Sequence, residues 1–211
     1  MIIGLDSASP DQSVALADSS GGLLADAAWS TPRGQGSELL PRIQSLLDGR
    51  GATLGDIQGV AVGLGPGSFT GLRVGLALAK GLAAGLGIPI VGVPSLDAWL
   101  DAVPEAAAAL VRAGAAEAWA RSRDEVEPRL IRFDAITAEA RAVRLVTPRE
   151  LADALGLSRA TPPDRAAAVI VRLAAGRFAA DATDDLAALE PVYLRPPRGL
   201  AEGPMVPVTW L

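Results

Sequence analysis

The sequence predicts an α/β fold of two lobes, in which mixed sheets are flanked by helices. Short apolar runs separated by turn residues open the chain, and two stretches with helical apolar periodicity follow, each succeeded by another apolar run. The resulting order is β-β-β-α-β-α-β, so the later strands are joined by crossover helices. This regular pattern weakens beyond about residue 101. We therefore expect one lobe over residues 1–100 and a smaller, divergent lobe over residues 101–211.

Three strands are predicted at the N-terminus. The apolar runs are Ile2–Asp6, Ser13–Ala17 and Leu23–Trp29. Gly21-Gly22 between the last two runs is a hairpin signal, so these strands should be antiparallel. A Gly-rich loop over residues 32–37 comes next.

The first helix is predicted over residues 37–49, with Ser37 as its cap. Its apolar positions recur at steps of three and four residues: Leu39, Leu40, Ile43, Leu46 and Leu47. A buried strand, Gly59–Leu64, follows this helix. A second helix then extends to about Gly87, and the next strand is expected at Ile88–Val93.

The second helix is apolar almost all round. One stripe comprises Leu72, Leu76, Ala79, Ala83 and Leu86, and the other comprises Val74, Leu78 and Leu82. One stripe can cover the sheet, whereas the other needs a second cover. That cover is either the helix of residues 37–49 or a subunit interface built from both helices. These two interpretations are compatible with each other. Small residues that would allow close helix approach occur in two pairs: Gly71 with Gly75, and Gly81 with Gly85.

The second half gives weaker signals. The Ala/Arg-rich stretch up to Arg123 fits a helix or a strand about equally. The remaining predictions are strands at Leu130–Phe133 and Ala142–Val146, helices at Pro148–Leu155 and Asp164–Arg177, and an irregular Pro-rich tail over residues 196–207.

Composition excludes several classes of chemistry. The chain has no cysteine and no histidine, which removes disulfides, thiolate nucleophiles, imidazole-based triads and HExxH zinc sites. Carboxylate, lysine, tyrosine, arginine or backbone chemistry stays open, as does no chemistry at all; we assign no catalytic residue and no metal ligand. With 24 acidic and 19 basic residues the net charge is -5, which argues against gripping nucleic acid unaided. No basic leader precedes an apolar stretch, so a cytoplasmic location is expected. Charged residues and prolines interrupt the apolar stretch over residues 59–96, so no membrane span is expected.

One loop could carry chemistry. Gly65–Arg73, GPGSFTGLR, lies between a predicted strand and a predicted helix, where glycines let backbone amides approach a phosphate. It fits neither the Walker nor the Rossmann spacing. The alternative is a tight, glycine-demanding turn that fixes strand-to-helix packing. Asp6 and Ser7, which follow the first strand, are the other candidates for phosphate or nucleotide contact, although a carboxylate at a strand end is more often solvated or capping.

These features together resemble the TsaB (YeaZ) family. The matching segments are Ile2–Leu16, Ser37–Ile43, Gly59–Leu96 and Pro191–Arg195. The GPGSFTGLR string is highly specific, whereas the second half matches poorly before PVYLR. Two positions depart from the family pattern: Gly36 stands where members often carry His, and Arg112 stands where Asp is expected.

The resemblance implies an actin-like (ASKHA, RNase H-like) fold and a non-catalytic role in the bacterial synthesis of threonylcarbamoyladenosine (t6A37) in tRNA. The implied partners are a TsaD-like transferase, a TsaE-like ATPase and, through the complex, tRNA; a homodimer is expected when the partner is absent. No cofactor of its own is implied, and ATP or ADP at the interface shared within the complex is left open. The expected loop and interface residues are Gly65, Pro66, Gly67, Ser68, Phe69, Thr70, Gly71, Arg73, Leu78, Leu82, Leu39 and Ile43.

Two other classes stay open from the residues alone. An actin-like phosphotransferase would hold nucleotide and Mg²⁺ with Asp6 and the loop over residues 65–71. A peptidase is less favoured, because the sequence offers neither a metal-binding pair nor an activated nucleophile.

Overall fold

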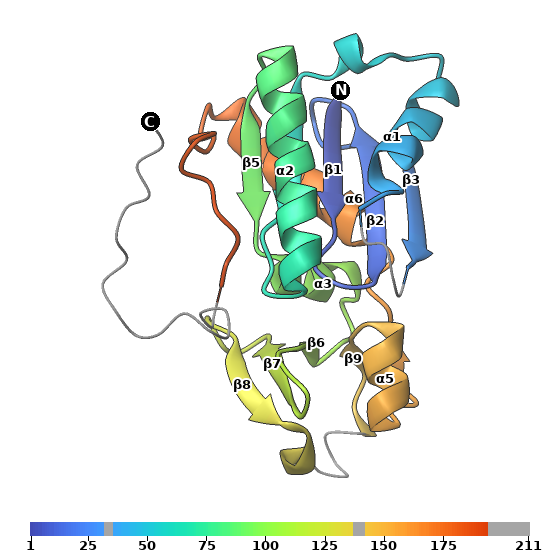
Figure 1. Cartoon of the computed structure of the whole chain (residues 1–211), viewed down its shortest axis with the longest axis vertical. Coiled ribbons are helices and arrows are strands. Elements are labelled where there is room, and N and C mark those ends of the chain that lie inside the picture. Colours follow the sequence, from blue (N-terminus) through green and yellow to red (C-terminus); the bar gives the residue numbers. More distant parts are fainter. Residues whose placement is uncertain (32–35, 137–141, 194–211) are drawn as a thin grey trace.

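The first sheet is mixed and has five strands in the order β3-β2-β1-β4-β5. The computed structural model describes residues 1–31, 36–136 and 142–193 (Figure 1). β1 pairs antiparallel with β2 and parallel with β4, as the predicted hairpins and crossovers require. The strands are β1 (Ile2–Asp6), β2 (Asp11–Ala17), β3 (Leu23–Ser30), β4 (Gly59–Gly63) and β5 (Ile90–Val93).

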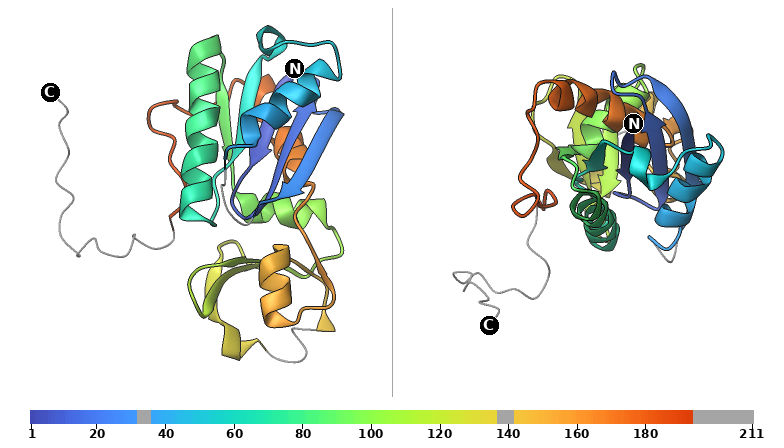
Figure 2. Two further views of the ribbon diagram at one scale, coloured as in Figure 1. Left: turned by 45° about the vertical axis from the view of Figure 1, so that its right-hand side comes forward. Right: turned by 90° about the horizontal axis from the view of Figure 1, so that it is seen from above.

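Helices cover both faces of this sheet. α1 (Leu39–Asp48) and α2 (Phe69–Leu86) lie on one face, and α6 (Ala166–Ala179) lies on the other (Figure 2). Successive side chains of β1 point to opposite faces of the sheet. Ile3 packs with the side chains of α1 and α2, and Ile2 packs with those of α6. Gly4 lets α6 approach closely, because a Cβ there would lie 2.4 Å from Val171 Cγ1.

The second sheet belongs to the second half of the chain, and its strand order is β10-β9-β6-β7-β8. α3 (Ser95–Ala102) leads from the first sheet into it, and α5 (Arg149–Leu155) packs beside it. The stretch that fitted helix or strand equally forms the antiparallel pair β6 and β7. The strands are β6 (Ala108–Arg112), β7 (Glu117–Ser122), β8 (Arg129–Arg132), β9 (Leu145–Val146) and β10 (Ala160–Thr161); the short 3₁₀ helices are Leu54–Asp56 and Phe133–Ala135.

The chain returns to the first sheet near its C-terminus. After α6, a segment over residues 182–193 follows the β5 edge and then reaches β4. Asp184 accepts a hydrogen bond from the Gly92 amide at 2.7 Å, and the Val192 amide donates to the Leu64 carbonyl at 2.8 Å. The two sheets therefore lie on either side of residue 101, while α6 and this segment pack on the first sheet. The division at residue 100 stays a prediction.

Most predicted elements are confirmed, and three details are wrong. Ser37 is not the cap of α1: the helix begins at Leu39, its N-cap is Glu38, and no side chain caps it. The Leu39 amide instead lies in a turn, donating to the Gly36 carbonyl at 3.3 Å. Leu40, expected in the apolar stripe, is 45% exposed. Of the predicted strand over residues 142–146, only Leu145–Val146 is a strand.

Some predictions fall outside the described residues. These are part of the Gly-rich loop (residues 32–35), the last two residues of PVYLR, and the tail over residues 196–207.

α2 has the length and mean hydropathy, 1.2 over 18 residues, of a helix that could cross a membrane. A core helix of a soluble protein shares these properties. Here the stripe of Leu72, Leu76, Ala79 and Ala83 is buried against the sheet.

Candidate functional site

Asp6, at the end of β1, is sealed inside the protein. Its side chain has no exposed surface. Oδ2 accepts a hydrogen bond from Trp99 Nε1 at 2.6 Å, and Oδ1 accepts one from Ser95 Oγ at 2.8 Å and one from the Ala8 amide at 3.4 Å. Burial raises the pKa of Asp6, and the bonds from Trp99 and Ser95 oppose that rise. α3, an element that the sequence did not predict, supplies both of these side chains.

Ser7 ties β1 to α2. Its Oγ donates to the Gly71 carbonyl at 2.9 Å. A Cβ at Gly75 would lie 2.1 Å from the same Oγ, so Gly75 is needed for α2 to approach the strand. The Gly71/Gly75 pair therefore faces the chain's own β1. A phosphate or nucleotide role for Asp6 and Ser7 stays a prediction.

The loop over residues 65–71 packs on the loop that follows β1. The Gly65 amide donates to Ser95 Oγ at 3.0 Å, and the Ser68 amide donates to the Ala8 carbonyl at 2.7 Å. Gly65 has a φ of +93°, and a Cβ at Gly67 would lie 2.1 Å from the Ala8 carbonyl oxygen. The Gly65–Pro66 peptide bond is cis. These are the contacts of a glycine-demanding turn, and anion binding by the loop stays a prediction.

The same loop positions the start of α2. Ser68 is the N-cap, and its Oγ accepts a hydrogen bond from the Gly71 amide at 3.2 Å. Phe69 and Thr70 follow in the first turn, where both are exposed.

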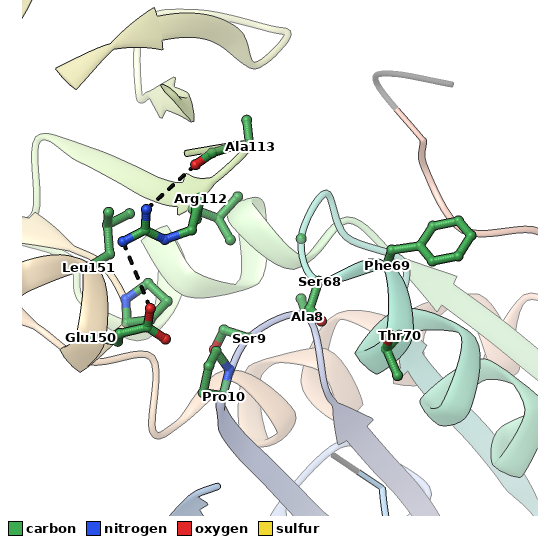
Figure 3. A pocket seen from close by; sticks show the side chains of 14 residues that line it. Ala8, Ser9, Pro10, Ser68, Phe69, Thr70, Arg112, Ala113, Glu150 and Leu151 are labelled. Carbon is green, nitrogen blue, oxygen red and sulfur yellow. Dashed lines mark hydrogen bonds and ion pairs between the residues drawn. The ribbon is translucent and has the colours of Figure 1, made fainter. Parts of the chain in front are cut away.

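A cavity of about 650 Å³ lies between the two halves of the molecule. Asp6 and Ser7 do not line it. Figure 3 shows Arg112 and Glu150 facing each other on one side of it. The lining residues are Ala8, Ser9, Pro10, Gly67, Ser68, Phe69, Thr70, Val111, Arg112, Ala113, Gly114, Pro148, Glu150 and Leu151.

Two motifs far apart in the sequence meet beside this cavity. The Arg73 guanidinium lies 3.9 Å from the Phe69 ring centroid, and its Nε donates to the Tyr193 hydroxyl at 2.9 Å. The Phe69 and Tyr193 rings are 5.4 Å apart, and their side chains are 41% and 36% exposed. Phe69 and Arg73 of GPGSFTGLR and Tyr193 of PVYLR thus form one exposed cluster, which we call the aromatic–arginine cluster.

The predicted interface residues of α1 and α2 do not all face outward. Leu39 and Ile43 are fully buried in the core of the first sheet. Leu78 and Leu82 are half-buried and pack against that core. The outward face of α2, which we call the open face, comprises Ala77, Gly81, Ala84 and Gly85. A Cβ at Gly81 or Gly85 would meet no atom within 4 Å among the residues that the structure describes.

Metal-binding groups are absent from the residues described. These residues contain no group of three or more Asp, Glu, His or Cys side chains that could hold a metal ion.

Comparison with known proteins gives the family. The sequence model of TsaD, described as tRNA N6-adenosine threonylcarbamoyltransferase, matches residues 32–142, which is more than half of the 211 residues. The chain belongs to the TsaD family. Two relatives of the chain carry the TsaB name, and the resemblance drawn from the sequence motifs is thereby confirmed.

The similarity to the TsaB proteins is local. The tRNA threonylcarbamoyladenosine biosynthesis protein TsaB of Escherichia coli (strain K12) is 46% identical over 65 residues, which are 31% of this chain and 28% of that protein. Its counterpart in Haemophilus influenzae is 42% identical over 67 residues, 32% of this chain and 28% of that protein. The match therefore spans less than a third of either relative.

The similarity in structure extends over most of the TsaD-family chain. YeaZ from Pseudomonas aeruginosa superimposes with a TM-score of 0.67 at 23% sequence identity, covering 92% of this chain and 99% of that one. The predicted actin-like fold class is confirmed.

Proposed function

We propose that the chain is a non-catalytic subunit of the bacterial complex that makes t6A37 in tRNA, where it pairs with a TsaD-like transferase. Family membership and the TsaB names of its relatives support the pathway. The observation that carries the non-catalytic role is the enclosure of Asp6. A phosphotransferase of this fold would need that carboxylate open to nucleotide and Mg²⁺, whereas Trp99 Nε1 and Ser95 Oγ occupy its two oxygens and no surface is exposed.

The pairing surface that we propose is the open face of α2 together with the aromatic–arginine cluster. Small residues at Ala77, Gly81 and Ala84 let a second helix approach closely. Exposed aromatic and arginine side chains are enriched at interfaces, and Phe69, Arg73 and Tyr193 lie at one end of this face. The same surface would carry a homodimer when the transferase is absent.

The remaining partners follow from the family and from charge. We propose that a TsaE-like ATPase joins the cytoplasmic complex, and that tRNA is bound through the complex because a net charge of -5 gives this chain little affinity for phosphates. We propose no cofactor for the chain itself. If the complex binds ATP or ADP, we propose that the nucleotide lies at the interface between this chain and its partners.

Calorimetric titration of the isolated chain with ATP and Mg²⁺ tests the role. We expect neither heat of binding nor ATP hydrolysis. In the phosphotransferase alternative, the nucleotide would bind in the cavity beside the loop over residues 67–70. That alternative therefore requires both a heat of ATP binding and ATP hydrolysis. Turnover that survives repurification and disappears in Asp6→Ala would contradict the non-catalytic role. Copurification from the native cell with a TsaD-like protein tests the pairing separately.

A further inference from the structure

The charged residues among those lining the cavity are Arg112 and Glu150. Arg112 ends β6, and Glu150 lies in the first turn of α5. Their chain neighbours Val111 and Leu151 are buried, so the backbone from which both charged side chains extend is held in place. The other lining side chains are apolar or carry hydroxyl groups.

The contacts that these two side chains make with each other are long. Arg112 Nη2 lies 3.8 Å from Glu150 Oε1, which is an ion pair without a hydrogen bond. Arg112 Nη1 donates to the Gly114 and Ala115 carbonyls at 3.5 Å each, and the guanidinium lies 5.3 Å from the Phe133 ring centroid. The side chains are 36% and 63% exposed. A ligand carboxylate at ordinary hydrogen-bond distance would be a better partner for Arg112 than any of these.

We propose that this end of the cavity binds a free α-amino acid, with its carboxylate on Arg112 and its ammonium group on Glu150. An α-amino acid carries both charges on one carbon, which matches an Arg–Glu pair whose charged atoms lie 3.8 Å apart. A peptide separates its terminal charges by at least a residue, and a nucleotide would bring phosphates toward Glu150. The apolar lining from Ala8, Pro10 and Val111 favours an uncharged side chain.

The test uses L-leucine as the probe and the isolated chain, so its result does not depend on any partner. Amide NMR signals of Gly67 and Gly114, which line the cavity from opposite halves, report binding, and the same spectra show that each variant is folded. We expect saturable shifts with a Kd on the order of 1 mM. Arg112→Gln, or replacing leucine by leucinamide, should weaken binding about tenfold or more. Arg132→Gln is the matched control, because Arg132 pairs with Asp134 outside the cavity.

The contact between the ligand's ammonium group and Glu150 is tested by a double-substitution cycle, in which one change is made in the ligand and one in the protein. N-acetyl-leucine should bind the native chain about tenfold more weakly than leucine, and the difference should vanish in Glu150→Gln. The proposal is overturned by absence of shifts up to about 10 mM leucine, by equal binding of leucine and leucinamide, or by an N-acetyl effect that persists in Glu150→Gln.

Discussion

Gly81→Arg separates docking from folding. Gly81 lies on the open face of α2, and an added Cβ would meet no atom of the described part of the chain within 4 Å. A helix-interior glycine costs about 0.8–1 kcal/mol relative to alanine, and arginine costs little. The substitution should therefore raise the free energy of unfolding by about 0.5–1 kcal/mol. For a chain of this size the Tm should rise by about 1–4 °C.

The same arginine should destroy the proposed complex. A guanidinium left without a partner in a desolvated interface costs about 3–5 kcal/mol, a loss of two to three orders of magnitude or more in affinity. Gly176→Arg is the matched control: Gly176 is an exposed helix glycine with equally open space, on α6, which covers the opposite face of the sheet. Leu78 and Leu82 are poorer test sites, because both pack against the core and an arginine there would also destabilise the fold.

The assay is a pair of measurements on each variant, thermal unfolding followed by circular dichroism and affinity for a TsaD-like partner by calorimetry. We expect both glycine variants to be at least as stable as the native chain, and only Gly81→Arg to lose the partner. Unchanged affinity in Gly81→Arg would show that the open face is not the interface. Equal loss in both variants would show a general effect of charge.

Three further outcomes are expected. In sedimentation velocity without a partner the chain should self-associate at high micromolar concentration, and Gly81→Arg should be monomeric; a native chain that stays monomeric contradicts this. Burial raises the pKa of Asp6 in the folded protein above 3.8, so the folded state binds this proton more tightly than the unfolded state does. The stabilisation that results is complete below the pKa of the unfolded state and is lost as the pH rises through the pKa of the folded state. Across that pH range the Tm of the native chain should therefore fall relative to the Tm of Asp6→Asn. Parallel curves of Tm against pH for the two proteins would contradict this prediction. Arg149→Ala should cost about 1.5–3 kcal/mol in urea unfolding, because Arg149 donates at 2.8 Å to Asp11, which is 2% exposed. Arg132→Ala, which removes an exposed ion pair, should change the free energy of unfolding less, and equal effects of the two substitutions would refute the difference.

The first half of the fold could be predicted because its signals are local. Gly21-Gly22 sits in the β2–β3 connection, and the apolar period of Leu72, Leu76 and Ala79 marks the buried face of α2. The second half carries shorter strands rich in alanine and arginine. There Leu110, Ala118 and Ala120 share one buried cluster because β6 pairs with β7. That pairing is not visible in the sequence of either strand alone.

The candidate site could be predicted only in part, because its decisive contacts are distant in sequence. The position of Asp6 at the end of a predicted strand marks it as a candidate. The donors that enclose it, Ser95 and Trp99, come from a helix 89 and 93 residues further along the chain. Tyr193 lies 120 residues from Arg73. A short apolar run such as SLDAWLDA gives no sign of which strand end it will cover.

The two glycine pairs of α2 show why spacing alone does not assign an interface. Gly71/Gly75 and Gly81/Gly85 share the same four-residue spacing and the same helix. The first pair meets Ser7, where a Cβ at Gly75 would lie 2.1 Å from its Oγ, so strand β1 occupies the space that a partner would need. Beyond Leu78 the outward residues Gly81, Ala84 and Gly85 are exposed, and a Cβ on either glycine of the second pair meets no atom of the described residues within 4 Å. The first pair therefore serves packing within the chain, and of the two pairs the second is the one with room for a partner helix.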